Sequence, residues 1–385
     1  MTAVPANLLA NDVVAREFTV SALQGGIEIV ERIADEWRDL CTRAVNDQPF
    51  YRPEWIRAYL QAFAPTARVV LVTVRRDGIL QLLLPLLKER AWVGGVALRR
   101  LRSPVNSHPG RFDAVLGEES DRTAVLGAAL DYLARLPGWD LLEMHFAPAN
   151  STIAEFVSTA RSRNFRCVEV PLFASPFIAV PRNSDGLKRM PPNSKLRSQL
   201  KQARRQLEQK SPLTLRRLNH LDREALRRFY ELEASGWKGQ QGSAILSHAS
   251  TRQFYDEVAE AAARSNSFCL YLLEWNGQLL AGHFGLVHKG RYYSPKVAYD
   301  ENLKKYAPGH LILAEILNDC ASRGMEEIDI TGPCDDWKMK WTADSRANYS
   351  YFLFAKSIRA RVAHAIRFKL RPALAALIRK QRRAA

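Results

Sequence analysis

The stretch from Arg291 to Trp341 constrains the fold of this chain more than any other. It opens with a strand-like run that includes Tyr292 to Tyr299, and after a polar loop it reaches Pro308-Gly309, where a helical stripe of aliphatic residues begins. Gly324 supplies a stop for that helix, and a second strand, Glu327 to Ile330, follows. Strand, helix and parallel strand form a unit whose ligand site lies at the N-terminus of the helix, where backbone N–H groups can hold an anion.

The same order of elements occurs twice in the chain. Hairpins with turns at Asp77-Gly78 and Asn276-Gly277 are each followed by loop and strand, a helix, and a strand that ends in a proline. A length of 385 residues also suggests two domains. We therefore predict an α/β (α+β) fold of two tandem domains, each a twisted mixed sheet flanked by helices. The predicted boundaries are a loose tail at 1–16, an N-terminal domain at 17–180, a C-terminal domain at 181–355 and a basic amphipathic tail at 356–385.

The net charge of +16 is concentrated in two segments. Residues 183–228 hold thirteen basic and four acidic residues, and residues 356–385 hold ten basic and none. The second segment places Ile358, Val362, Ile366 and Leu370 on one helical stripe. Such a tail can lie on an anionic membrane surface, and a helix docked on the body or a partly disordered tail is an equally good interpretation. Nucleic-acid binding is not favoured, because no module typical of it accompanies the charge.

The cellular location and the metal content are predicted from sequence features that are missing, namely membrane spans, a signal peptide and metal-binding motifs. No apolar run reaches the roughly 18 residues of a membrane span, and the N-terminus has no basic start followed by an apolar core. We expect a cytoplasmic protein, with peripheral contact at the inner membrane face left open. The five cysteines include no CxxC pair and the eight histidines are scattered, so we predict reduced thiols and no metal.

Several of these residues carry a resemblance to a known family. The chain resembles the CelD/BcsL-type acetyltransferases associated with bacterial cellulose biosynthesis, which belong to the GNAT superfamily and have a tandem arrangement similar to that of the Fem peptidyltransferases. The resemblance extends from about Phe50 to Phe354. It rests on Tyr299-Asp300, Ala307-Pro308-Gly309, Gly324, Ile328-Asp329, Gly332, Lys338 and Trp341. One departure is that the usual GNAT pyrophosphate loop, Arg/Gln-x-x-Gly-x-Gly/Ala, is replaced by Lys304 to Gly309 with a single glycine.

The resemblance implies an N-acyltransferase that moves an acyl group, acetyl above all, from acyl-CoA to an amine or, less often, a hydroxyl. The acceptor would be a polysaccharide- or envelope-related molecule or a small molecule. Lys338 would act electrostatically, Asp329 would take the amine proton, and Tyr299 and Tyr306 would protonate the thiolate. The residues expected to bind the donor are Tyr293, Lys296, Val297, Lys304, Lys305, Pro308, Gly309, His310 and Leu311. Those expected on the substrate side are Trp237, Lys238, Gly242, Trp337 and Trp341.

Other interpretations stay open at this point. Trp237 lies in a glycine-rich loop, where a ligand wall and a simple hydrophobic anchor are equally good explanations. The first copy of the fold has nothing like Pro308-Gly309 at its helix start, so we assign it to scaffolding and acceptor binding. A Fem-like transferase that uses aminoacyl-tRNA, or a non-catalytic accessory protein, would also fit. The sequence predicts neither the acceptor nor the oligomeric state.

Overall fold

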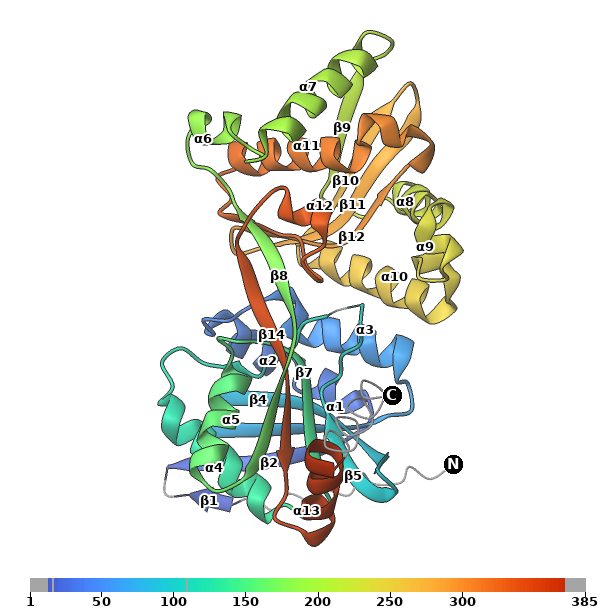
Figure 1. The fold of residues 1–385 in the computed structure, drawn as a ribbon. Helices are drawn as coiled ribbons and strands as arrows, with labels where there is room; N and C mark the ends of the chain where they lie inside the picture. The colour runs from blue at the N-terminus through green and yellow to red at the C-terminus, as the bar shows by residue number, and fades with distance from the viewer. Residues whose placement is uncertain (1–12, 16, 109, 371–385) are drawn as a thin grey trace, which may run out of the picture.

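The structure is a computed structural model that describes residues 13–15, 17–108 and 110–370. Figure 1 shows two bodies, one above the other, joined by two long strands. The predicted α/β architecture of two tandem domains, each made of sheet and helices, is confirmed.

The first half of the chain builds most of the lower body. Its strands are β1 (Val13–Ala15), β2 (Phe18–Gly25), β3 (Arg68–Arg76), β4 (Ile79–Val93), β5 (Val96–Arg102), β6 (Val115–Leu116), β7 (Leu141–Pro148) and β8 (Arg166–Ala179). Its helices are α1 (Glu28–Arg32), α2 (Ala34–Thr42), the 3-10 helix η1 (Pro49–Tyr51), α3 (Pro53–Phe63), α4 (Arg122–Arg135) and α5 (Thr152–Ser162).

The second half of the chain builds the upper body and then returns. Its strands are β9 (Leu213–Leu218), β10 (Phe268–Trp275), β11 (Gln278–His288), β12 (Arg291–Tyr299), β13 (Glu327–Asp329) and β14 (Ser345–Phe354). Its α-helices are α6 (Ser184–Lys188), α7 (Ser194–Glu208), α8 (Arg223–Ser235), α9 (Trp237–Gln240), α10 (Ala249–Arg264), α11 (Pro308–Ser322), α12 (Asp336–Met339) and α13 (Ile358–Ala365). Two 3-10 helices, η2 (Ile245–Ser247) and η3 (Glu301–Tyr306), and a π-helical turn, η4 (Ile366–Leu370), complete it.

All strands belong to one mixed sheet. Their order is β1-β2-β3-β4-β5-β7-β14-β8-β13-β12-β11-β10-β9, with β6 beside β4. One end of β8 pairs with β13, and the rest pairs with β14, which also pairs with β7. The segment 345–354, which the sequence groups with the C-terminal domain, therefore lies in the sheet of the lower body.

The repeated order of elements is visible in both bodies. The hairpins β3–β4 and β10–β11 turn at Asp77-Gly78 and Asn276-Gly277, and all four residues have positive φ, as a two-residue hairpin turn requires. Each body also has one parallel pair, β5 with β7 and β12 with β13. Helix α11 ends at Ser322, and Gly324 follows with φ +66°, as the sequence predicts.

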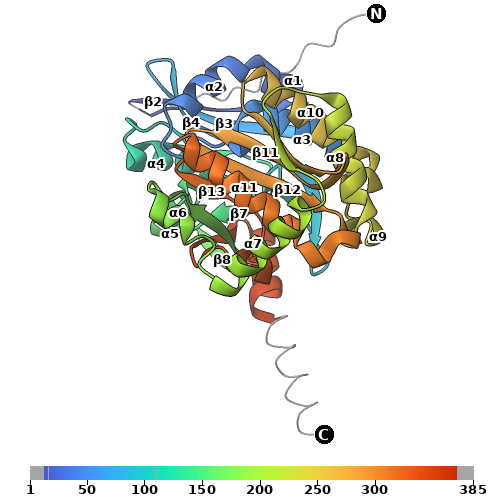
Figure 2. The same cartoon turned by 90° about the horizontal axis from the view of Figure 1, so that it is seen from above.

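Helices cover both faces of the sheet, and one core crosses the seam between the bodies. Figure 2 shows α11 and α7 side by side over the upper sheet. On the opposite face, buried aromatic residues of α3 and α10, among them Trp55 and Phe254, share one hydrophobic cluster. Because the cluster is continuous, the two bodies are packed against each other as well as joined by strands.

Within the described part of the chain, none of the helices combines the length and apolar character needed to cross a bilayer. Residues 371–385 of the predicted basic tail, and most of the predicted N-terminal tail, lie outside the described residues.

Candidate active site

A cavity opens where the parallel strands of the upper body separate. β12 and β13 pair over only three residues, Arg291–Tyr293 with Glu327–Asp329, and β12 then continues to Tyr299 paired with β11 only. The cavity has a volume of about 430 Å³ and lies at the start of α11. Its lining residues are Leu232, Glu233, Gly236, Trp237, Lys238, His283, Val297, Ala298, Tyr299, Glu301, Lys304, Ala307, Pro308, Gly309, His310, Asp335 and Trp337.

The N-terminus of α11 faces this cavity without a side-chain cap. Ala307 adopts a left-handed conformation, φ +50°, and Pro308 occupies the first helical position. Pro308 has no N–H, and the N–H groups of His310 and Leu311 donate to the Ala307 carbonyl. Gly309 therefore supplies the first-turn amide that can face an anion, aided by the helix dipole.

His310 presents a hydrogen-bond donor at the same place. The indole N–H of Trp341 donates to His310 Nδ1 over 2.9 Å. An indole nitrogen can only donate, so Nδ1 must be the acceptor and Nε2 carries the proton of the neutral ring. Burial and the charge of Lys340 lower the pKa of His310 to about 4, which keeps the ring neutral at physiological pH. Trp341, predicted to contact substrate, instead orients a residue that lines the cavity.

The opposite wall is formed by α8, α9 and the inner strands. The buried carboxylate of Glu233 is shared by two ammonium groups, Lys238 at 3.2 Å and Lys296 at 3.3 Å, and accepts the Ile245 N–H. Lys238 also donates to the carbonyl of Val297 over 2.6 Å. Burial lowers the pKa of Lys238. Lys238 of α9 and Lys296 of β12 thus both bind Glu233 near the end of α8, and these ion pairs hold the three elements together.

His283 is a cavity residue that the sequence analysis did not identify. It is 1% exposed, and its Nδ1 lies 2.9 Å from the Ser294 hydroxyl oxygen. Burial, together with the charge of Lys238, lowers its pKa to about 3, so the ring is neutral and resists protonation at physiological pH. Glu233 was missed as well. Neither belongs to a recognisable motif, because both reach the cavity only through strand pairing and helix packing.

Lys338, expected to act in catalysis, lies beneath the turn that follows β13. Its ammonium donates to the carbonyl oxygens of Thr331 and Pro333, each at 2.9 Å, and pairs with Asp335 at 3.1 Å. It is 7% exposed and does not line the cavity. Its three N–H donors are used inside the protein, so the geometry gives it a positioning role for Asp335 and Trp337.

Asp329 points away from the cavity and across the seam. Its carboxylate receives two hydrogen bonds from Arg111 of the lower body, at 2.6 and 3.3 Å, and one from the Thr331 N–H. Both side chains of this ion pair are almost fully buried. A carboxylate held in this way joins the two bodies, and the structure does not place it where an amine would lose a proton.

The remaining predicted residues divide into two groups. Trp237, Lys238, Val297, Tyr299, Lys304, Pro308, Gly309, His310 and Trp337 line the cavity. Tyr293, Lys296, Tyr306, Lys305, Leu311 and Gly242 do not. Tyr293, Tyr306 and Leu311, which were expected in the site from the family resemblance, are instead buried in hydrophobic clusters.

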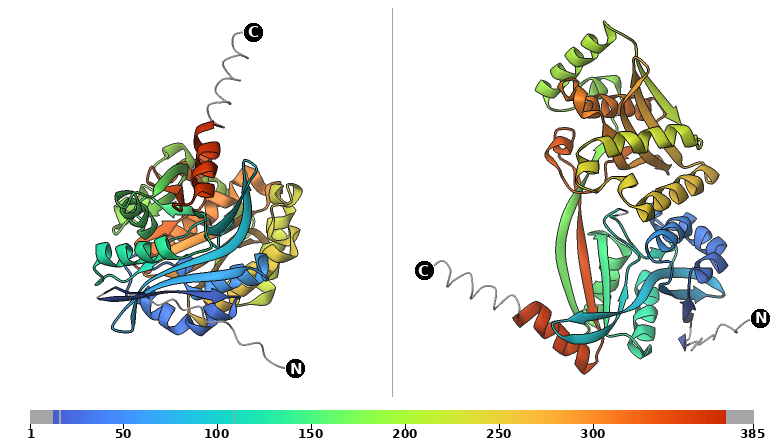
Figure 3. Two further views of the ribbon diagram at one scale, coloured as in Figure 1. Left: turned by 90° about the horizontal axis from the view of Figure 1, so that it is seen from below. Right: turned by 90° about the vertical axis from the view of Figure 1, so that its right-hand side faces the viewer.

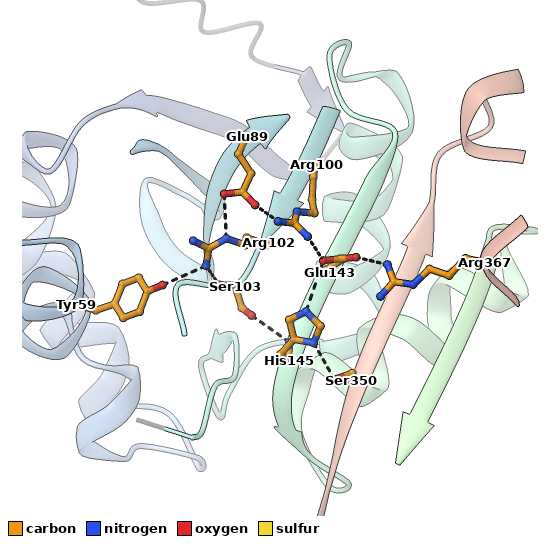
Figure 4. Close-up of polar contacts among 9 residues, drawn as sticks. All are labelled: Tyr59, Glu89, Arg100, Arg102, Ser103, Glu143, His145, Ser350 and Arg367. Atoms are coloured by element: carbon orange, nitrogen blue, oxygen red, sulfur yellow. Dashed lines mark hydrogen bonds and ion pairs between the residues drawn. The ribbon is translucent and has the colours of Figure 1, made fainter. Parts of the chain in front are cut away.

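In the lower body, the helix that matches α11 is α4 (Arg122–Arg135), and its N-terminus is capped by a side chain. The Asp121 carboxylate caps α4 by accepting the Ala124 N–H, so this helix start already carries a negative charge. At the ends of β5 and β7, Ser103 Oγ accepts the His145 N–H over 3.0 Å (Figure 4). A hydroxyl side chain thus bridges the two parallel strands where they end in the lower body, and Thr331 does the same in the upper body by donating to the Ser294 carbonyl over 3.0 Å.

The part of the chain that contains the cavity matches the model of a known family. The family model described as the acetyltransferase (GNAT) domain matches residues 194–339, a range that contains every residue lining the cavity. The match covers less than half of the chain, so it shows a similarity of this segment to GNAT domains. No curated protein matches the chain significantly.

Solved structures with this fold span nearly the whole chain. FemX has 12% sequence identity and a TM-score of 0.60, over 87% of this chain and 98% of FemX. A protein of unknown function from Bacteroides thetaiotaomicron has 13% identity and a TM-score of 0.51, over 83% and 97%. The C-terminal domain of a putative lysylphosphatidylglycerol synthetase from Agrobacterium fabrum has 11% identity and a TM-score of 0.50, over 88% and 95%. At these identities the likeness concerns the fold alone.

Proposed function

We propose that this protein is an acyltransferase that moves an acyl group, acetyl above all, from acyl-CoA to an amine. The observation that carries the proposal is the cavity at the uncapped N-terminus of α11, beyond the point where β12 and β13 separate, inside the segment that is similar to GNAT domains.

The residues of the cavity suit the parts of such a donor. The edge of β12 that β13 leaves uncovered beyond Tyr293 can pair with a pantetheine arm through backbone groups other than the Ser294 and Val297 carbonyls, which already accept hydrogen bonds from Thr331 and Lys238. The Gly309 N–H and the Lys304 ammonium can hold the pyrophosphate. The Nε2–H of His310 is a donor that can polarise the thioester carbonyl, and stabilisation of this kind is commonly worth about 10²- to 10³-fold in rate.

The acceptor would enter along the wall formed by Trp237 and His283. An amine must lose a proton as it attacks. Neutral His283 lines the cavity and can form a hydrogen bond with the amine, but a ring with a pKa of about 3 is too weak a base to keep that proton at physiological pH. The Tyr299 phenol, also in the lining, can return a proton to the leaving thiolate. We further propose, from the resemblance to the CelD/BcsL-type enzymes, that the acceptor is a polysaccharide- or envelope-related amine in the cytoplasm.

An aminoacyl-tRNA donor is the second candidate, and the loop before α11 favours it. Residues 301–306 form a 3-10 helix whose N–H groups are partly used internally, for example Leu303 to Asp300 and Asn302 to the Asp300 carboxylate. This loop offers a pyrophosphate fewer free amides than a glycine-rich one. A third possibility is an accessory protein that binds the donor without turnover.

Calorimetric titration of the full chain with acetyl-CoA and with a long-chain acyl-CoA tests the donor. We expect saturable binding that Gly309→Pro weakens at least about tenfold, because the substitution removes the amide that faces the anion. Lys195→Pro is the matched control, since Lys195 is the second residue of α7, which starts away from the cavity.

Equal losses in both variants, or no binding of either donor to a folded wild type, would contradict the acyl-CoA proposal. In the second case, binding of aminoacyl-tRNA with a steep salt dependence would support the Fem-like alternative.

A further inference from the structure

The last described helix presents apolar residues to solvent. α13 packs on the lower sheet through Ala360 and Ala363, both fully buried. Ile358, Val362 and Leu370 face outward, with exposures of 77%, 43% and 55%. The sequence places Ile358, Val362, Ile366 and Leu370 on one apolar stripe of this segment. Most of that stripe faces solvent, and the helix packs on the sheet through its alanines instead.

The segment is fixed to the sheet rather than loosely attached. Arg367 of η4 donates to the buried Glu143 of β7 over 2.5 Å (Figure 4). Its guanidinium lies 4.4 Å from the centroid of the Phe352 ring. Burial opposes ionisation of Glu143, but its contacts with His145, Arg367 and Arg100 outweigh that effect and lower its pKa to about 2. The anchor therefore stays charged at physiological pH and holds the outer face in place.

The exposed face is also strongly basic. Lys356, Arg359, Arg361 and Lys369 are exposed, and neither Arg359 nor Arg361 forms an ion pair with a described residue. From Lys356 to the end of the sequence there are ten Lys/Arg and no acidic residue. A second copy of the same face would meet like charge, which argues against self-association there.

The tip of the β4–β5 hairpin also supports this segment. Both views of Figure 3 show the tip beside α13, and Gly94 of the tip lies against the Ile366 side chain. Val93 packs with Ala360 and Ala363 of α13. Trp92, although 75% exposed, therefore points to the other face of the hairpin and is not part of the outer face of α13.

We propose that the outer face of residues 356–370 docks the protein on a membrane that contains anionic phospholipid. Apolar side chains flanked by unpaired basic ones match the two layers of such a surface, acyl chains beneath acidic headgroups. Recognition of a nucleic acid would use the basic residues but would leave Ile358 and Val362 without a role. The surface lies outside the cavity of α11, so the proposal does not depend on the acyltransferase function.

Co-sedimentation of the full chain with vesicles tests this. We expect binding to vesicles of phosphatidylglycerol and phosphatidylcholine, no binding to phosphatidylcholine alone, and a strong decrease between low and high salt. Arg359→Glu/Arg361→Glu should lower the partition coefficient at least about tenfold. The matched control is Lys201→Glu/Arg205→Glu, an exposed basic pair on α7 with the same change in net charge.

The apolar contribution needs its own pair of variants. Ile358→Ser/Val362→Ser should lower binding at constant charge, whereas Ile79→Ser, 56% exposed on another hairpin, should not. Unchanged melting temperatures would show that each variant is folded. The proposal is overturned if wild type ignores anionic vesicles at low salt, if the α7 pair lowers binding as much as the α13 pair, or if the serine variants bind normally. It is also overturned if the apolar variants instead abolish a dimer seen by sedimentation.

Discussion

At the scale of single residues, Lys338 stabilises a turn, although the sequence suggested a catalytic role for it. Thr331 and Gly332 after β13 both have positive φ, which is unfavourable for a β-branched threonine. The Lys338 ammonium binds the carbonyl oxygens on either side of Gly332. A Cβ on Gly332 would lie 3.2 Å from that ammonium, so glycine at this position leaves room for it. The interaction holds the segment that brings Asp335 and Trp337 to the cavity.

We expect Lys338→Met to lower the free energy of unfolding by about 2 to 4 kcal/mol, because carbonyl groups and a carboxylate lose their partner. Urea unfolding measures this. Lys340→Met, an exposed lysine two residues away, should change stability by less than about 0.5 kcal/mol. If Lys338→Met were as stable as wild type yet failed to bind donor, Lys338 would act on the ligand directly and the positioning role would be wrong.

At the scale of elements, β14 joins the two ends of the chain. It lies between β7 and β8 and pairs with both. In the sequence, however, β7 ends at Pro148 and β14 begins only at Ser345. Leu353 of β14 is fully buried in the core of the lower body. The lower body is thus incomplete until the upper one has been made.

Truncation after Asp344 should therefore expose the backbone of β7 and β8 to fast hydrogen exchange, because each loses a neighbouring strand. Truncation after Leu370, which leaves β14 and α13 in place, is the control and should keep both strands protected. Hydrogen–deuterium exchange with mass spectrometry reads the two strands separately. Protection of β7 in the shorter variant would mean that the lower body folds without β14.

At the scale of the whole molecule, buried charges fix the seam between the bodies. Asp47 of the lower body binds Arg52 and also pairs with His288 and Lys289 of the upper body, at 2.8 and 3.2 Å. Although burial opposes its ionisation, the hydrogen bonds from His288 and Arg52 hold the pKa of Asp47 well below its usual range. Arg111 and Asp329 form a second such contact.

Asp329→Asn should lower stability by about 3 to 5 kcal/mol, because it leaves the buried Arg111 without a counter-charge. The double variant Arg111→Met/Asp329→Asn should cost less than the sum of the single variants, as a thermal or urea double-mutant cycle would show. Glu315→Gln, which breaks a more exposed pair with Arg204, should cost less than about 1 kcal/mol. Additive single effects would rule out a direct interaction across the seam.

The sequence by itself determined the local features of this protein. Hairpin turns at Asp77-Gly78 and Asn276-Gly277, the start of α11 at Pro308 and the end of α11 before Gly324 all follow from short-range backbone preferences, so they were readable from neighbouring residues. The position of the cavity at the N-terminus of α11 followed for the same reason.

Only the tertiary structure decided which side chains reach that cavity. His283 and Glu233 enter it, while Asp329 turns to Arg111, a partner 218 positions away in the sequence. The same holds for β14, whose place between β7 and β8 depends on long-range pairing. Alternation and periodicity define the faces of an element, but the partner that each face meets is set by how distant segments pack, which no local pattern encodes.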